Sequence, residues 1–287
     1  MIDFPIVDTH LHIWDINRFR YPWLEDQTYL KRTFTIGEYR KATEKASVEH
    51  MVFVQCECDP SQYREEVKWI TEIANKDDQG IGGIVAWAPL EKGEAVEPEL
   101  AELSKNKLVK GIRRIIQYEE DLEFCLRPDF IAGVRLLGKY GMTFDICISE
   151  KHNRNVIKLM EKAGDGVPMI LDHLGKPDIK ERALDPWRSE IRAMSEFPNV
   201  FCKVSSLASE ADWEAWTIDE ILPYGEHAFE CFGYDRTVFG SDWPPSGRAK
   251  GVDFYKCVDL VERCMKGATK DEKREVFHDN AVGFYRL

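Results

Sequence analysis

Short apolar segments alternate with amphipathic segments along the whole 287-residue chain. The apolar segments are rich in β-branched side chains, a pattern typical of buried parallel strands. We predict strands at 6–12, 50–56, 82–88, 109–116, 142–148, 167–173, 200–204 and 237–242. The apolar residues within 15–34 recur at neither strand nor helix spacing, and we expect this segment to form a long loop.

Apolar residues at helical spacing lie between these strands, as at Val67, Ile70 and Ile73. Such spacing predicts amphipathic helices that cover a sheet. We expect helices at 35–46, from 59 onward, and at 94–104, 128–140, 153–163, 187–197, 218–232, 252–266 and 270–277. Helix-start signals support the first two, because 35–38 reads as a capping box and 59–60 as an N-cap Asp followed by Pro.

Eight strand–helix units in succession predict an α/β protein. The arrangement that eight such units favour is a closed (β/α)₈ TIM barrel, here with residues 1–287 as a single domain. A doubly wound open sheet is the alternative, but no Gly-x-Gly-x-x-Gly turn follows any predicted strand.

Composition excludes several classes of function. The chain is 44% hydrophobic and 31% charged, and its formal net charge of −12 lacks the basic surface that nucleic acids and anionic membranes require. No apolar run approaches the roughly 18 residues of a membrane span. The first strand begins close to Met1, so we expect no export signal, a cytoplasmic location and reduced cysteines. A small molecule is the expected partner, and a homo-oligomer is left open.

Polar residues stand at the ends of several predicted strands. In a (β/α)₈ barrel, the carboxyl ends of the strands surround the active site. His10 and His12 end the first strand and project to the same side, because side chains alternate along an extended chain. The other strand ends contribute Gln55, Glu57, Arg113, Arg114, Gln117, Asp172, His173, Ser241 and Asp242.

Three strand-end motifs together resemble the amidohydrolase superfamily. They are Asp8-Thr9-His10-Leu11-His12, Leu171-Asp172-His173-Leu174-Gly175-Lys176-Pro177 and Phe239-Gly240-Ser241-Asp242-Trp243-Pro244. More narrowly, they are similar to its lactonase branch, which opens sugar-acid lactones, sulfomuconolactone and pyrone dicarboxylate. The resemblance covers nearly the whole chain and implies hydrolysis of a lactone.

The resemblance implies two alternatives for the histidine cluster. In the first, His10, His12, His173 and Asp242 hold one divalent ion, for which zinc suits the nitrogen and oxygen ligands best. In the second, no metal is needed and the histidines donate hydrogen bonds to the substrate. A two-metal site is not expected, because Arg113 replaces the usual fourth-strand ligand and 144–148 contains no histidine.

The implied mechanism assigns Asp242 and His173 to catalysis. Asp242 would deprotonate water, and the histidine cluster would polarise the ester carbonyl. A metal-dependent decarboxylase or C–C hydrolase of the same superfamily, acting on a cyclic carboxylic acid, is the alternative enzyme. A barrel that binds without catalysis is the alternative from another class.

The substrate-binding residues follow partly from geometry. Arg113 and Arg114 are adjacent and face opposite sides of a strand, and the resemblance to the family, which carries a Gly-x-Arg pattern here, implies that Arg113 is the one in the barrel mouth. Its guanidinium suits a carboxylate, a sulfonate or several hydroxyls. The remaining candidates are Trp14, Trp23 and Trp243 as an apolar wall, and Glu57 and Gln117 as partners of substrate hydroxyls. We favour a sugar-acid lactone over a dicarboxylate or a sulfonate.

Other polar residues receive no role. We expect Lys176, which follows the sixth strand, to be solvated. His50 begins a strand, at the end of the barrel opposite the site. His152, His227 and His278 are expected on surface helices or loops.

Overall fold

The structure, a computed structural model, describes residues 2–76 and 80–287. Eight parallel strands follow one another in chain order around a barrel, which confirms the predicted (β/α)₈ fold. They are β1 (Ile6–Leu11), β2 (Val48–Val54), β3 (Ile81–Ala86), β4 (Val109–Ile112), β5 (Thr143–Ile146), β6 (Met169–Leu171), β7 (Val200–Val204) and β8 (Thr237–Phe239). The ring closes where Asp242 N donates to His10 O and His12 N donates to Trp243 O, both at 2.9 Å.

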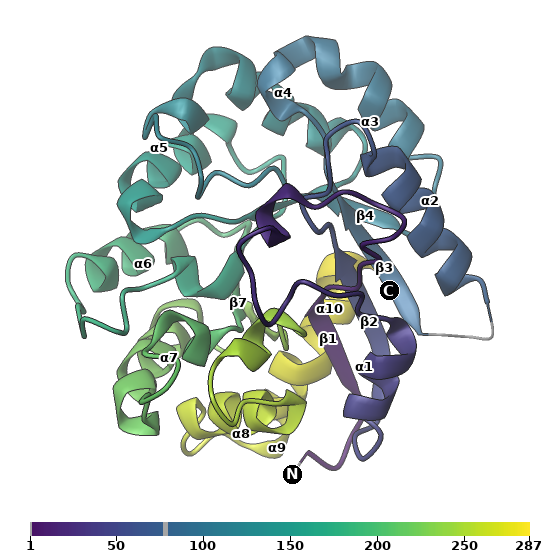
Figure 1. Cartoon of the computed structure of the whole chain (residues 1–287). Coiled ribbons are helices and arrows are strands. Elements are labelled where there is room, and N and C mark those ends of the chain that lie inside the picture. Colours follow the sequence, from purple (N-terminus) through teal and green to yellow (C-terminus); the bar gives the residue numbers. More distant parts are fainter. Residues whose placement is uncertain (1, 77–79) are drawn as a thin grey trace.

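Helices surround the strands, as Figure 1 shows in a view along the barrel. They are α1 (Ile36–Ala42), α2 (Tyr63–Ala74), α3 (Glu97–Leu103), α4 (Pro128–Lys139), α5 (Asn153–Ala163), α6 (Trp187–Ser195), α7 (Ile218–Phe232), α8 (Phe254–Cys264), α9 (Lys270–Arg274) and α10 (Asn280–Tyr285). The predicted capping box is confirmed, because Thr35 and Glu38 bond reciprocally at the start of α1.

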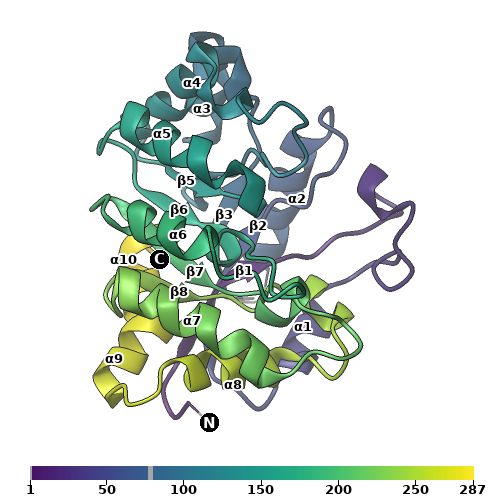
Figure 2. The ribbon, with the colours of Figure 1, turned by 90° about the vertical axis from the view of Figure 1, so that its left-hand side faces the viewer.

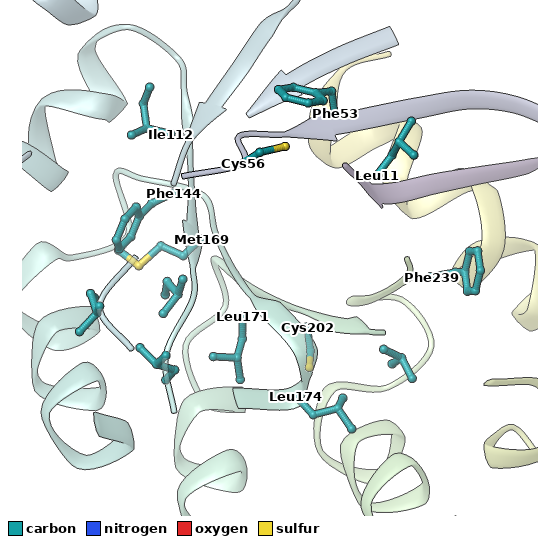
Figure 3. Packing of buried hydrophobic residues seen from close by; sticks show 14 of the residues in the cluster. Leu11, Phe53, Cys56, Ile112, Phe144, Met169, Leu171, Leu174, Cys202 and Phe239 are labelled. Carbon is teal, nitrogen blue, oxygen red and sulfur yellow. The ribbon is translucent and has the colours of Figure 1, made fainter. Parts of the chain in front are cut away.

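Side chains of the strands alternate between two buried layers. Leu171 on β6 and Cys202 on β7 belong to the larger cluster, between strands and helices, and Figure 3 shows them on the same side of the sheet. Val52, Ile170 and Val238 belong to a smaller cluster inside the barrel. This alternation directs the polar residues that follow the inner layer toward the barrel axis.

The last helix closes the amino-terminal end of the barrel. Ala281, Phe284 and Tyr285 of α10 pack against the inner cluster. Figure 2 shows α10 at one end of the barrel and the purple segment after β1 at the other end. The sequence prediction stopped at 277 and missed this helix.

The segment between β1 and α1 crosses the open, carboxyl-terminal end of the barrel (Figure 1). It contains only one short 3₁₀ turn (Pro22–Leu24), which agrees with the predicted loop over 15–34. Trp14 and Phe34 exchange backbone hydrogen bonds of 3.0 and 2.9 Å, and Trp14 Nε1 donates to Arg32 O at 2.7 Å. These bonds fix the segment as one wall of the barrel mouth.

Several predicted boundaries are wrong by a few residues. The helix expected from 59 begins at Tyr63, because Asp59 instead caps a turn by accepting from Ser61 N at 3.0 Å. The fourth strand ends at Ile112 rather than 116, since Arg113 and the residues after it leave the ladder.

Over the described ranges, no helix is long and apolar enough to cross a membrane. All eight cysteines are free thiols, and all but Cys231 are buried. The cytoplasmic location stays a prediction.

Candidate active site

A cavity of about 290 Å³ opens at the carboxyl-terminal ends of the strands. Its lining residues are His12, Trp14, Trp23, Cys56, Glu57, Arg113, Ile115, Gln117, Tyr118, Cys147, His173, Lys176, Ser206, Ser209, Glu210, Trp213, Asp242, Pro245 and Arg248. The structure thus brings most of the predicted site residues into one cavity of a size that suits a small molecule.

His10 of β1 and His12, which follows β1, meet beneath this cavity, and His12 lines it. His10 Nε2 lies 3.1 Å from His12 Nε2. His12 Nδ1 lies 2.7 Å from Val54 O, and since a carbonyl only accepts, Nδ1 must carry the proton. Burial lowers the pKa of His12 to about 3, so its ring is neutral and Nε2 offers a lone pair. Burial also holds the pKa of His10 well below its ordinary value.

Asp242 faces this histidine pair from the end of β8. Its Oδ1 lies 3.6 Å from His12 Nε2 and 3.8 Å from His10 Nε2. Its Oδ2 accepts a short hydrogen bond from the Ser206 hydroxyl. Burial raises the pKa of Asp242 to about 6. The group therefore gains basicity while it can still ionise near neutral pH, as a general base requires.

His173 completes the cluster from the end of β6. Its ring centroid lies 4.4 Å from that of His10, and its Nδ1 lies 2.8 Å from Ser205 Oγ. Burial lowers the pKa of His173 far below its ordinary value, so the ring is neutral. All four residues predicted to form the catalytic centre thus lie together.

A buried carboxylate supports the junction of β1 and β8. Asp8 accepts from Ser241 N at 2.8 Å, from Tyr39 OH at 2.8 Å and from His10 N at 3.2 Å, as well as from Ser241 Oγ. Gly240 allows the two strands to approach, because a Cβ there would come within 2.8 Å of His10 Cβ. These contacts fix the backbone on both sides of the catalytic pair.

The adjacent arginines separate as predicted. Arg113 is buried in the cavity, where Nη2 donates to Gln55 O at 2.6 Å and Nη1 lies 3.5 Å from Asp172 Oδ2. Arg114 does not line the cavity: it pairs with Glu91 at 3.1 Å and Glu119 at 2.7 Å. The structure therefore does not bring Arg114 into this cavity with the other predicted binding residues.

The other predicted binding residues divide in the same way. Trp14, Glu57 and Gln117 line the cavity, with Glu57 accepting from Gln55 Nε2 at 2.6 Å. Trp243 does not line the cavity. It packs with its ring centroid 5.5 Å from those of Phe34 and Tyr39, so the structure does not bring this tryptophan into the cavity. The tryptophan contacts the aromatic core because the chain turns after Asp242.

Sequence reasoning underestimated the basic residues of the cavity. Lys176 was expected to be solvated, but it lines the cavity and lies 4.0 Å from Glu210 Oε1. Arg248 lines the same wall and stacks over Trp213, with Cζ 5.3 Å from the ring centroid. The 206–213 loop and the loop after β8 supply this wall, and the order of the sequence alone does not bring them together.

A buried ion-pair network beneath the histidines was also missed. Lys203 Nζ lies 2.5 Å from Asp145 Oδ2 and 3.0 Å from Asp172 Oδ1. Tyr285 OH of α10 donates to the same Asp145 oxygen at 2.8 Å. One sequence signal could have predicted this network: each of two mainly apolar strands, 143–146 and 200–204, contains a single charged residue. Such a charge needs a buried partner.

Two histidines were placed wrongly on the surface. His152 is fully buried, with Nε2 3.3 Å from Glu119 O, and His227 is buried with Nε2 2.8 Å from Arg188 O. Neither lines the cavity, so they pack structurally between elements.

Five residues of the cavity wall adopt a left-handed backbone, which non-glycine residues seldom adopt. The φ values are +52° at Glu57, +53° at His173, +51° at Lys176, +58° at Ser206 and +53° at Asp242. Each costs about 1 kcal/mol or more, and such strain concentrates at functional sites. The turns direct these side chains into the cavity rather than along the strands.

The donor atoms fit one divalent ion. His10 Nε2, His12 Nε2 and Asp242 Oδ1 are separated by 3.1 to 3.8 Å, close to the roughly 3.3 Å edge of a tetrahedron with bonds of about 2.0 Å. Nitrogen and carboxylate ligands suit zinc. One condition applies to His10: its Nε2 can bind a metal only when the ring proton resides on Nδ1.

Comparison with known proteins agrees with this geometry. The sequence profile of the amidohydrolase family matches residues 7–287. The chain belongs to the amidohydrolase family. It is 30% identical to an L-fucono-1,5-lactonase from Burkholderia multivorans over 90% of this chain and 87% of the relative. It is 22% identical to an L-rhamnono-gamma-lactonase from Scheffersomyces stipitis over the full length of both.

Among solved structures, an amidohydrolase from Burkholderia multivorans with bound zinc superposes with a TM-score of 0.87. It is 28% identical and covers 99% of this chain and 100% of that chain. These relatives confirm the resemblance to the lactonase branch of the amidohydrolases that the three strand-end motifs indicated.

Proposed function

We propose that this amidohydrolase opens the lactone of a sugar acid by adding water to the cyclic ester. The observation that carries the proposal is the position of Asp242, a buried carboxylate with a raised pKa that lies 3.6 to 3.8 Å from two neutral histidines. The lactonase names of relatives that match at least 90% of this chain support the choice of reaction.

Asp242 acts as the general base. It takes a proton from a water molecule in the cavity, and the resulting hydroxide attacks the lactone carbonyl. When the ring C–O bond breaks, Asp242 returns the proton to the leaving alkoxide. The Ser206 hydroxyl orients the carboxylate by donating to Oδ2 and leaves Oδ1 free toward the histidines.

His173 and Arg113 act on the carbonyl oxygen, because the proton on His12 Nδ1 leaves His12 Nε2 without a hydrogen to donate. His173 and His12 line the cavity beside Asp242, and the Arg113 guanidinium lies 3.3 Å from His10 Nε2. Fixed donors in a buried site stabilise the oxyanion because they need no reorganisation. A divalent ion held by His10, His12 and Asp242 would add Lewis-acid polarisation of the same oxygen.

The rest of the cavity suits a polyol ring. Trp14 and Trp23 provide apolar faces, while Glu57, Gln117 and Glu210 provide acceptors for hydroxyl groups. Lys176 and Arg248 share their wall with Glu210, and Lys176 Nζ lies 4.0 Å from Glu210 Oε1. The mixture favours a hydroxyl-rich lactone over a dicarboxylate.

A lactone panel tests the proposal. Ring opening of aldonolactones, muconolactones and pyrones releases a proton, which a pH indicator records in weak buffer. In ¹⁸O-labelled water, one labelled oxygen should enter the product carboxylate. Asp242→Asn should lower kcat by about 10² to 10⁴, whereas Asp271→Asn on the exposed side of α9 should leave kcat unchanged. Release of carbon dioxide without ring opening would instead identify a decarboxylase, and no turnover of any lactone would contradict the proposal.

A further inference from the structure

Lys203 is the most deeply buried cation beneath the active site. Its side chain is fully buried in β7 and faces three acceptors: Asp145 Oδ2 at 2.5 Å, Asp172 Oδ1 at 3.0 Å and His10 Nδ1 at 3.4 Å. A lysine ammonium has three N–H donors and no acceptor. Lys203 donates a hydrogen bond to Asp145, forms an ion pair with Asp172, whose carboxylate oxygens have no hydrogen-bond partner among the described residues, and lies within donor distance of His10 Nδ1.

The tautomer of His10 follows from its neighbours. An Nδ1 that accepts from Lys203 has no proton, so the proton of the neutral ring resides on Nε2. His10 Nε2–H then donates to His12 Nε2 at 3.1 Å, the atom that must accept because His12 Nδ1 donates to Val54 O. The three contacts form one consistent series of donors and acceptors.

The opposite tautomer has poorer contacts. A proton on His10 Nδ1 would point toward the Lys203 ammonium, and its acceptor would be Asp172 Oδ1 at 3.5 Å. His10 Nε2 would accept from Arg113 at 3.3 Å, but it would also place its lone pair against that of His12 at 3.1 Å. At each nitrogen the contact is longer than in the Nε2–H form, 3.5 against 3.4 Å at Nδ1 and 3.3 against 3.1 Å at Nε2, and a lone-pair repulsion is added. The Nε2–H form has one opposing contact, because Arg113 Nη1, also a donor, lies 3.3 Å from the same Nε2.

We propose that Lys203 is a positioning residue that holds His10 in the Nε2–H tautomer through the Lys203–Asp145–Asp172 network. In this state His10 is a hydrogen-bond donor aimed at His12, which lines the cavity. Metal binding by His10 then requires the proton to move to Nδ1, where Asp172 Oδ1 can accept it. Lys203 therefore opposes coordination of a metal ion by His10. Only the use of this tautomer in catalysis rests on the proposed function.

Tautomers can be read directly in metal-free protein without substrate. Histidine-labelled ¹⁵N protein gives long-range ¹H–¹⁵N spectra in which the two tautomers have different patterns, and His10→Gln identifies the His10 signals. The wild-type protein should show His10 as Nε2–H. Lys203→Met keeps the length of the side chain and removes its donors, so His10 should change to Nδ1–H. Zinc affinity, measured against a competing chelator, should rise at least tenfold.

Two further variants keep the test decisive. Lys203→Met leaves the two buried carboxylates of Asp145 and Asp172 with less positive charge to balance them, which can destabilise the fold. The double variant Lys203→Met/Asp145→Asn, which removes one charge of each sign, is therefore measured in parallel. Tyr285→Phe removes a donor to Asp145 without touching His10, and it should change neither the tautomer nor the zinc affinity. An Nδ1–H signal in wild type, or an unchanged signal in both lysine variants, would overturn the proposal. The lactone assay is independent of this result.

Discussion

The hydroxyl of Ser206 should set the pH at which this enzyme becomes active. Burial raises the pKa of Asp242 to about 6, and the Ser206 hydrogen bond opposes that rise by stabilising the carboxylate. A general base works in its ionised form, so activity should fall as the pH drops through about 6. In Ser206→Ala the carboxylate loses this donor, and the acidic limb should move to higher pH.

The size of the shift follows from the hydrogen bond. A bond to a charged group contributes about 1.5 to 3 kcal/mol, which corresponds to roughly 1 to 2 pKa units. The limb should therefore move from about 6 to roughly 7 to 8. At pH 6.5, a shift of about 1.5 units lowers the ionised fraction roughly eightfold. Above pH 9 the two enzymes should differ little.

The assay is kcat/KM for a turned-over lactone between pH 4.5 and 9, with spontaneous hydrolysis subtracted. Ser209→Ala is the matched control, because Ser209 lines the same cavity and its buried hydroxyl has no hydrogen-bond partner in the described residues. Its pH profile should match that of wild type. An acidic limb at the same pH in Ser206→Ala and wild type would refute the reasoning.

Three further predictions, the first with a matched control variant, test other parts of the structure. Arg113→Lys should lower kcat/KM at least tenfold, because one ammonium cannot replace a fork of donors, while Arg114→Lys should change it less than twofold; equal losses would contradict the separation of the two side chains. Tyr39→Phe removes a donor from buried Asp8 and should cost about 1 to 3 kcal/mol of unfolding free energy, measured by denaturant titration. Gly133→Ala should cost about 1 to 3 kcal/mol or more, because its Cβ would meet the backbone of the 90–96 turn, and an unchanged Tm would exclude this contact.

The barrel could be predicted from sequence because its strands are nearly continuous apolar runs. Once the strands were predicted, their carboxyl-terminal ends were also predicted. His10, His12, His173 and Asp242 could therefore be placed together from the sequence alone. Boundaries were less predictable. Asp59 caps a turn as readily as a helix, and the short closing helix α10 carries a weak period over only six residues.

Interactions between distant segments could not be predicted in the same way. Asp145 and Lys203 are 58 residues apart, and nothing in either strand shows that the two charges meet. Trp243 and Lys176 follow predicted strand ends, but the turn after each strand decides which way the side chain points. Left-handed residues make these turns, and a sequence pattern does not reveal left-handed backbone at His173 or Asp242.

The left-handed residues of the cavity wall also affect how this protein can be engineered. Glycine adopts that backbone without penalty, so replacing Glu57 or Ser206 by glycine would relieve local strain while removing a side chain that faces the cavity. A library screened only for heat resistance would therefore enrich variants that have lost part of the active site. Thermostable variants of this amidohydrolase should be selected under simultaneous pressure for turnover, or with these five positions held constant.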